Sequence, residues 1–197
     1  MTIAIVDYHA GNLASVKKAF DHLGADAVVT SQPEVIAAAD KVVLPGVGHF
    51  AATVMLAELG LRPAIEQALG RGIPFLGICV GMQWMFEGSE EASGVPGLGL
   101  WAGQCKQFPA TVKSPHVGWN TLQMRRASRL LSGVEDQSFV YFTHSFRAPI
   151  VDSTAAACEY AGPFSAVVER DNIFGVQFHP EKSGPAGQKL LENFCGL

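Results

Sequence analysis

The sequence predicts an α/β fold: an open, mostly parallel central sheet with helices on both faces and an antiparallel extension in the second half. In the first half, short runs rich in Val and Ile alternate with longer segments of helical periodicity, the β-α-β-α order of a covered parallel sheet. From about residue 98, short strand-like pieces lie between Gly, Pro, Asn and Asp turns, which indicates antiparallel pairing. No long linker interrupts the chain, so we expect a single domain over residues 1–197.

The expected elements follow in chain order. Apolar runs in the first half predict strands at Thr2–Asp7, Ala27–Thr30, Lys41–Leu44 and Pro74–Ile78. Helical periodicity predicts helices at Leu13–Leu23, Phe50–Leu59, Pro63–Leu69 and Met82–Phe86. The second half predicts strands at Gly103–Phe108, Phe139–Phe142, Ala155–Glu159, Ala166–Glu169 and Ile173–Gln177, then a helix at Ala186–Phe194 that packs back against the sheet. Right-handed crossovers would bring the carboxyl ends of the parallel strands to one edge, where sites in open α/β folds lie.

The composition excludes several classes of protein. The chain is 48% hydrophobic and 16% charged, as compact folded proteins are. A net charge of −4 without a polybasic run predicts no nucleic-acid partner. The first residues read as a strand and not as a signal peptide, and no apolar stretch approaches the ~20 residues of a membrane span, so we expect a cytoplasmic protein without a membrane partner. Four cysteines without a CxxC pair predict reduced thiols and no metal site.

The first candidate for chemistry is Cys79, which lies between an apolar strand and a helical segment with glycines on both sides, at Gly77 and Gly81. This is the pattern of a nucleophile elbow, in which a sharp strand-to-helix turn exposes the nucleophile. The helix N-terminus favours a thiolate, and the backbone N–H of Val80 would be available to an oxyanion. Because free cysteines are often buried core residues, this segment alone fits a structural cysteine equally well.

The second candidate is the pair His179 and Glu181, which follows another apolar strand. If both strand ends lie on the same edge of the sheet, the imidazole would reach the thiol of Cys79 and Glu181 would orient the imidazole. A lone histidine at a strand end is more often a packing residue. A cysteine elbow and a His-x-Glu, each at the end of an apolar strand, reverse that preference.

The third candidate is the Gly46-Val47-Gly48 segment between a Val-rich strand and a helical segment. Two glycines around one residue allow the backbone to approach a ligand and to reorient. By itself the pattern fits an ordinary strand-to-helix turn equally well, and it lacks the lysine and the spacing of a phosphate loop.

These three segments together resemble the motifs of class I, triad-type glutamine amidotransferases. The motifs are PGVG at 45–48, GICVGMQ at 77–83 and GVQFHPEKS at 175–183, and the resemblance covers essentially the whole chain. It implies that Cys79 forms a γ-glutamyl thioester with the substrate glutamine, that His179 and Glu181 activate it, and that ammonia leaves. It implies neither a metal nor an organic cofactor.

Three further segments resemble one branch of that family. DYHAGNL at 7–13, PHVGWN at 115–120 and YFTHSF at 141–146 are similar to stretches of the amidotransferase subunit of imidazole glycerol phosphate synthase, an enzyme of histidine biosynthesis. The resemblance implies a heterodimer with a (β/α)8 cyclase subunit, which receives ammonia through a tunnel. The cyclase would convert a phosphoribulosyl-formimino carboxamide nucleotide into imidazole glycerol phosphate and an aminoimidazole carboxamide ribonucleotide.

The resemblance also implies supporting roles. The N–H groups of Val47 and Val80 would bind the oxyanion, with the Val47 peptide facing away until the synthase binds its ligand. Asn12 and Trp119 would face the cyclase. The implied glutamine-binding residues are Gly48, Gln83 at the carboxylate end, Glu91 at the α-ammonium, and the backbone of Ser145 and Phe146.

The sequence departs from the family pattern at two positions. His9 stands where a glycine is common, and Phe146 stands where a tyrosine is common. Neither lies in the triad motifs, so the departures concern the interface and the pocket. In addition, Glu90 adjoins Glu91, and a shift by one residue would exchange their roles.

Three alternatives stay open at this point. The first is a subunit that feeds another synthase, such as those of anthranilate, GMP or pyridoxal phosphate; the PHVGWN and VDYHAGNL segments argue against it. The second is a cysteine peptidase or chaperone-like member of the wider elbow-cysteine fold, which needs neither Gln83 nor the HPEKS ending. The third is a non-catalytic binding subunit, against which the presence of all three triad residues argues.

Overall fold

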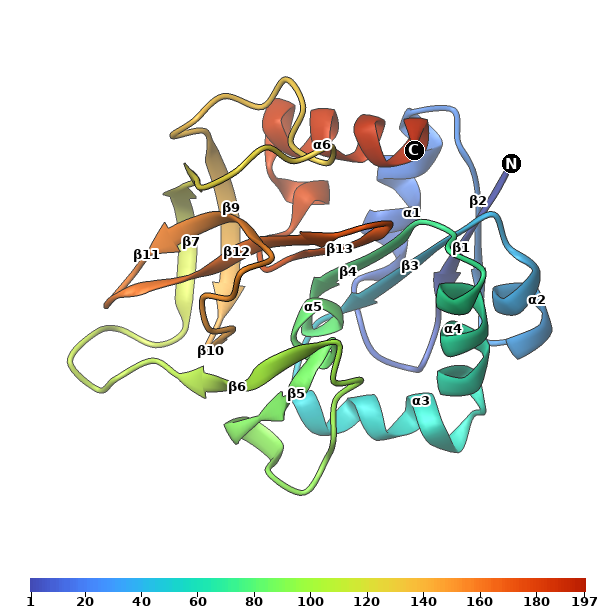
Figure 1. Cartoon of the computed structure of the whole chain (residues 1–197), viewed down its shortest axis with the longest axis horizontal. Coiled ribbons are helices and arrows are strands. Elements are labelled where there is room, and N and C mark those ends of the chain that lie inside the picture. The colour runs from blue at the N-terminus through green and yellow to red at the C-terminus, as the bar shows by residue number, and fades with distance from the viewer.

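The computed structural model describes residues 1–197 and contains a central eight-stranded sheet in the order β2-β1-β3-β4-β13-β12-β11-β8 (Figure 1). The strands from β2 to β13 are mutually parallel, and β13, β12, β11 and β8 pair antiparallel. The parallel strands are β1 (Thr2–Val6), β2 (Asp26–Thr30), β3 (Lys41–Gly46), β4 (Phe75–Cys79) and β13 (Ile173–Val176). The antiparallel strands are β12 (Pro163–Arg170), β11 (Thr154–Glu159) and β8 (Gln123–Met124). The predicted fold class is confirmed.

Helices cover both faces of this sheet. Figure 1 shows α1 and α6 on one side and α3, α4 and α5 on the other. The α-helices are α1 (Leu13–His22), α2 (Pro33–Ala38), α3 (Met55–Glu58), α4 (Leu61–Gly70), α5 (Val80–Trp84) and α6 (Gly184–Gly196). The short 3-10 helices are η1 (Phe50–Val54), η2 (Glu90–Ala92) and η3 (Pro180–Lys182).

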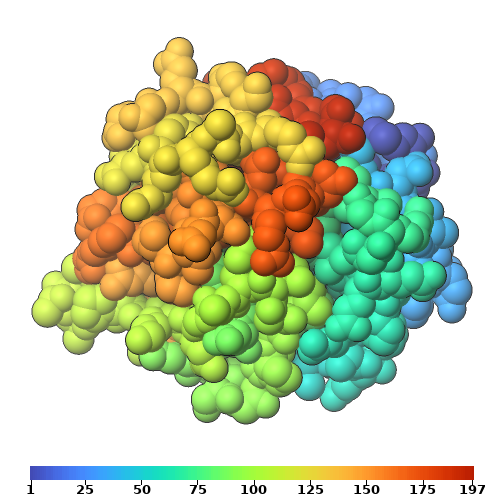
Figure 2. All heavy atoms as spheres, viewed as in Figure 1, coloured from blue at the N-terminus to red at the C-terminus, as the bar shows by residue number.

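Two smaller sheets complete the second half. The antiparallel pair β7 (His116–Thr121) and β9 (Phe139–His144) forms one of them. The other contains β5 (Phe86–Ser89), β6 (Trp101–Gln107) and β10 (Phe146–Arg147). Segments far apart in the chain thus meet at the surface, where orange and red residues lie between green and yellow ones (Figure 2).

Several predicted boundaries were wrong. The helix expected at Phe50–Leu59 is η1 followed by α3, because the Thr53 hydroxyl donates to the Phe50 carbonyl at 2.8 Å and competes with regular α-helical bonding. The helix expected at Met82–Phe86 begins at Val80 and ends at Trp84, because Phe86 opens a strand that pairs with β6. The short elements α2, β5, β7, β8 and β10 were not predicted.

The closing helix α6 packs against the sheet, as expected. Phe194 lies 6.3 Å, centroid to centroid, from both Phe20 of α1 and Phe174 of β13. At its C-terminal end, the Nζ of buried Lys41 donates to the carbonyl oxygens of Phe194 and Cys195 at 2.7 Å each. A lysine at this point satisfies helix carbonyls that have no intrahelical partner.

We expect Lys41→Met to lower the free energy of unfolding by about 2–3 kcal/mol, because the buried Phe194 carbonyl and the partly buried Cys195 carbonyl lose charge-assisted hydrogen bonds while the aliphatic volume is kept. Urea unfolding followed by circular dichroism measures this loss. Lys189→Met on the exposed side of α6 is the matched control, since its contact with Glu192 is a 3.8 Å surface ion pair worth at most about 1 kcal/mol. Equal losses in the two variants would contradict the capping role.

Candidate active site

The turn from β4 to α5 holds Cys79 in a strained conformation, with φ +54° and ψ −109°. Positive φ is rare outside glycine and persists where the surrounding structure enforces it. The backbone on both sides of Cys79 is closely packed: a Cβ on Gly81 would lie 1.9 Å from the Leu44 carbonyl oxygen, and one on Gly77 would lie 2.7 Å from the Gly81 carbonyl oxygen. The helix can therefore cross the strands closely enough to form the elbow only because both positions are glycine.

His179 reaches the same edge of the sheet because β13 is the parallel neighbour of β4, with Val176 opposite Ile78. The backbone N–H of His179 donates to the Tyr141 carbonyl at 2.9 Å, which ties the strand end to β9. Its ring Nδ1 lies 2.8 Å from Oε1 of Glu181, and both side chains are buried. The carboxylate of Glu181 therefore bonds the ring nitrogen on the side away from Nε2.

The electrostatics favour a protonated imidazole. Burial by itself lowers the pKa of His179, but interaction with the neighbouring Cys79 and with the hydrogen-bonded Glu181 outweighs it and raises the pKa to about 10. The ring Nε2 is buried beside the thiol and makes no well-formed hydrogen bond. It is therefore free to exchange a proton with a reacting group.

We expect His179 to remain protonated through neutral pH in ¹⁵N NMR spectra of the imidazole. Because its folded pKa of about 10 lies above the ordinary 6.5, the group stabilises the folded state fully below pH 6.5. This contribution is lost as the pH rises through about 10. Cys79→Ala removes one of the two stabilising partners, so the titration should move to lower pH. A wild-type ring that titrates near 6.5 would contradict this account.

A pocket of about 250 Å³ lies over the elbow. It contains Cys79 and most of the residues expected to bind the oxyanion and glutamine. Its lining residues are Val47, Gly48, Cys79, Val80, Gln83, Glu91, Pro115, Thr143, His144 and Ser145. Pro115, Thr143 and His144 were not predicted as site residues, although they lie within the segments that carried the family resemblance.

The two adjacent glutamates have different positions. Oε2 of Glu91 accepts a hydrogen bond from the Phe50 N–H at 2.7 Å, and Glu91 lines the pocket. Glu90 is exposed, and its carboxylate accepts from the Gln107 N–H at 3.2 Å. The pocket therefore presents the carboxylate of Glu91.

Gln83 lines the pocket, and its side chain also bonds to the backbone of Phe146. The Gln83 side chain is buried, and its Nε2 donates to the Phe146 carbonyl at 2.9 Å and to Oε1 of Gln177 at 3.1 Å. Phe146 is not among the lining residues, since its carbonyl is engaged inside the protein. Sequence reasoning missed Gln177, whose Nε2 donates to the Cys79 thiol at 3.7 Å. Its place two residues before His179 was the only signal.

The two residues expected at a partner interface occupy different settings. Asn12 donates through Nδ2 to Oε1 of Glu181 at 3.4 Å, so it contacts the candidate triad directly. Trp119 is 53% exposed and Val117, on the same face of β7, is 56% exposed. The indole packs edge-on against Tyr141 at 6.0 Å. Two large apolar side chains on one strand face form a candidate contact surface.

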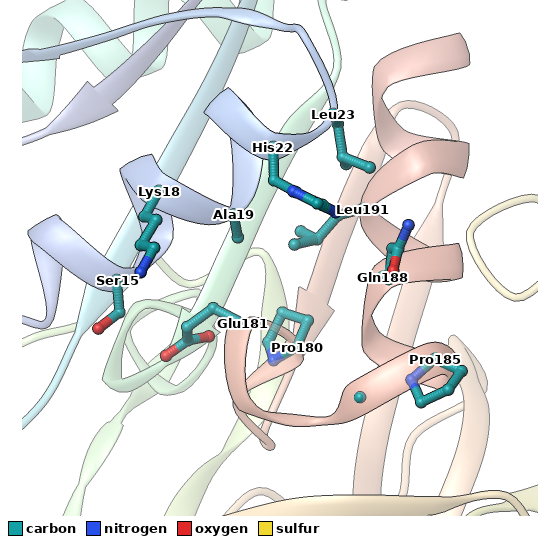
Figure 3. Close-up of a pocket in the computed structure, with 11 residues that line it drawn as sticks. Ser15, Lys18, Ala19, His22, Leu23, Pro180, Glu181, Pro185, Gln188 and Leu191 are labelled. Carbon is teal, nitrogen blue, oxygen red and sulfur yellow. The ribbon is translucent and has the colours of Figure 1, made fainter.

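A larger groove of about 520 Å³ lies behind Glu181, between α1 and α6 (Figure 3). Lys18 and His22 of α1 border it on one side and Gln188 of α6 on the other. Figure 3 shows Glu181 and Pro180 at its base. Cys79 lines the smaller pocket and not this groove, so the smaller pocket is the candidate active site.

Comparison with known proteins agrees with this geometry. The model of the family "Glutamine amidotransferase class-I" matches residues 4–196, and the chain belongs to that family of enzymes. Within it, the chain belongs with proteins named imidazole glycerol phosphate synthase subunit HisH. It is 48% identical to the one from Desulfitobacterium hafniense, over 98% of this chain and 92% of that protein. It is also 48% identical to the one from Methanothermobacter thermautotrophicus, over 99% of this chain and 98% of that protein.

Solved structures support the fold. The PurLQS structure from Thermotoga maritima aligns with a TM-score of 0.78 at 18% identity, over 99% of this chain and 97% of that chain. At this identity the likeness concerns the fold alone. None of the helices combines the length and apolar character that crossing a membrane requires.

Proposed function

We propose that Cys79, His179 and Glu181 hydrolyse glutamine to glutamate and ammonia, and that the ammonia passes to a (β/α)8 cyclase subunit in a heterodimeric imidazole glycerol phosphate synthase. The observation that carries the proposal is the buried His179–Glu181 pair at the same sheet edge as the strained elbow cysteine, whose thiol opens onto the pocket. All four cysteines are free thiols, which suits the cytoplasm as the place of action.

The reaction begins with attack of the Cys79 thiolate on the side-chain amide carbon of glutamine. The C–S bond forms, and the carbonyl electrons move onto oxygen. The imidazolium of His179 then gives its proton to the leaving nitrogen as the C–N bond breaks, so that ammonia departs and a thioester remains. Neutral His179 next takes a proton from water, which attacks the thioester. Collapse of this second intermediate releases glutamate, restores the thiolate and leaves His179 protonated. Glu181 stabilises the ring whenever it is protonated.

The oxyanion in both steps would be bound by the N–H groups of Val80 and Val47. Val80 opens α5, and Val47 lies between two glycines with different constraints. Gly46 is packed tightly, since a Cβ there would lie 2.5 Å from the Tyr8 hydroxyl, whereas Gly48 has φ +107° and open space around it. The Val47 N–H belongs to the peptide between Gly46 and Val47, and the glycines on both sides allow the backbone angles that a rotation of this peptide requires, which fits an oxyanion donor that is switched into place.

The substrate would be held by groups on the opposite side of the pocket. The carboxylate of Glu91 suits the α-ammonium of glutamine, while Gly48 and the backbone of Ser145 complete the pocket. Gln83 and Phe146 act by shaping the wall, because their polar groups already bond to one another. The exposed face of β7 at Val117 and Trp119, with Asn12 beside Glu181, would meet the cyclase.

The test measures glutamate release by the chain alone, with a cyclase subunit, and with the cyclase plus its nucleotide ligand. We expect little activity in the isolated chain and strong activation in the last mixture, because ammonia released without an acceptor is lost. Trp119→Ala should weaken the activation by raising the cyclase concentration that it requires. Full activity without the cyclase would contradict the switch. Activity that the cyclase leaves unchanged would keep the glutaminase but assign it to another synthase.

A further inference from the structure

We infer that a chain of buried hydrogen bonds, which runs from Asn120 on β7 to the thiol of Cys79, positions the nucleophile and one wall of its pocket; this inference rests on the proposed function. We name this chain the polar relay. Its members between Asn120 and Cys79 are His116, His144, the Phe146 carbonyl, Gln83 and Gln177. None of these side chains belongs to the triad.

A single acceptor determines the protonation pattern of both histidines. The Phe146 carbonyl can only accept, so Nδ1 of His144, at 2.8 Å, carries the hydrogen. Nε2 of His144 is then an acceptor, and it lies 3.1 Å from Nδ1 of His116, which must donate. Nε2 of His116 in turn accepts from the Nδ2 amide group of Asn120 at 3.3 Å. Every contact in this arm therefore has one donor and one acceptor.

Burial keeps both rings neutral, as this pattern requires. His116 is 5% exposed and His144 is 6% exposed. Desolvation lowers the pKa of His116 to about 4 and that of His144 to about 3. The ring of His116 also stacks on the rings of Tyr160 and Phe142, with ring centroids 4.1 Å and 5.0 Å apart, so packing holds the plane of the ring. Because both rings are neutral and held in fixed planes, the relay keeps the same hydrogen-bond pattern at neutral pH.

The second arm leads from the same carbonyl to the nucleophile. Nε2 of Gln83 donates to the Phe146 carbonyl and to Oε1 of Gln177, which leaves the amide nitrogen of Gln177 directed at the Cys79 thiol. Gln177 is fully buried. A neutral N–H that donates to sulfur favours the thiolate over the thiol without adding a titratable group.

The consequence is that the pocket wall and the nucleophile depend on one shared point, the Phe146 carbonyl. His144 itself lines the pocket between Thr143 and Ser145. Loss of its hydrogen bond would free the carbonyl to turn, and Gln83 would lose a fixed partner. His116, His144 and Gln177 are accordingly positioning residues, since they act on the reaction through other groups.

The first experiment compares His144→Phe with His144→Asn in the full chain with the cyclase and its nucleotide. Phenylalanine removes the donor, whereas the asparagine amide nitrogen stands close to the position of Nδ1 and can still donate to the Phe146 carbonyl. We expect kcat/KM for glutamine to fall about tenfold in His144→Phe, as loss of one buried hydrogen bond implies. We expect His144→Asn to recover to within about threefold of wild type. Phe164→Leu is the packing control, because the Phe164 ring lies 5.1 Å from the His144 ring, centroid to centroid, and makes no hydrogen bond in the relay. This variant should leave kcat/KM unchanged.

The second experiment needs neither glutamine nor a partner. The rate of Cys79 alkylation by iodoacetamide is measured against pH in the wild type and in Gln177→Leu. We expect the variant to react about tenfold more slowly at neutral pH and its profile to move to higher pH, because the thiolate has lost a donor. If the wild type hydrolyses no glutamine, the proposed function fails while this assay still decides on the relay. Unchanged alkylation in Gln177→Leu, or equal losses of kcat/KM in both His144 variants, would overturn the inference.

Discussion

Replacement of Cys79 by alanine is expected to lower the rate of glutamine hydrolysis by at least about 10³-fold, because no other group in the pocket can form the thioester. Alanine keeps the Cβ and hence the strained backbone at this position, so the fold should survive. Glutamate release is measured with the cyclase and its ligand present, and thermal unfolding is followed on the same sample.

The matched control for this prediction is Cys195→Ala. Cys195 is a free, half-buried thiol near the end of α6 and lies outside the pocket. Its removal should leave glutamate release within about twofold of wild type. The triad residues should also behave as one unit, so that His179→Ala adds little to the loss in Cys79→Ala. Substantial hydrolysis by Cys79→Ala would mean that another nucleophile acts, and the mechanism proposed above would be wrong.

The second large effect is expected for Gly81→Ala, which should lower the free energy of unfolding by at least about 3 kcal/mol. The added methyl group would lie 1.9 Å from the Leu44 carbonyl oxygen and 2.9 Å from the Leu44 carbonyl carbon. Both are backbone atoms of the central strand β3 and cannot move aside as a flexible side chain would. Equilibrium unfolding in urea measures the change.

Gly70→Ala is the matched control for that variant. Gly70 is the last residue of α4, and a Cβ there has nothing within 4 Å. The same substitution should therefore stabilise the protein by up to about 1 kcal/mol through helix propensity. If Gly81→Ala and Gly70→Ala behaved alike, the steric explanation of the elbow would be wrong. If Gly81→Ala folded stably yet lost activity, the chain would have relieved the clash with Leu44 by moving the elbow, and the predicted loss of stability would be wrong.

The sequence alone determined the parallel half of the sheet and the chemical types at the site. The strands β1 to β4, the helix α1 and the closing helix follow from periodicity and from turn residues, which are local properties. Cys79, His179 and Glu181 became candidates for the same reason, since each lies in a short motif at a strand end. The elements that the sequence did not reveal are short, such as α2 and β8, and owe their structure to neighbours in space.

Only the tertiary structure decided which of these residues lie together. Glu90 and Glu91 are neighbours in the chain, and only the packing of η2 against η1 sets one carboxylate toward the Phe50 N–H and leaves the other outside. No sequence pattern predicts the hydrogen bonds that connect Gln177, His144 and His116 to the site. Their partners lie in other strands, up to 98 positions away between Gln177 and Cys79. Periodicity reports which face of an element is buried, but a donor meets a distant acceptor only once the sheets have packed.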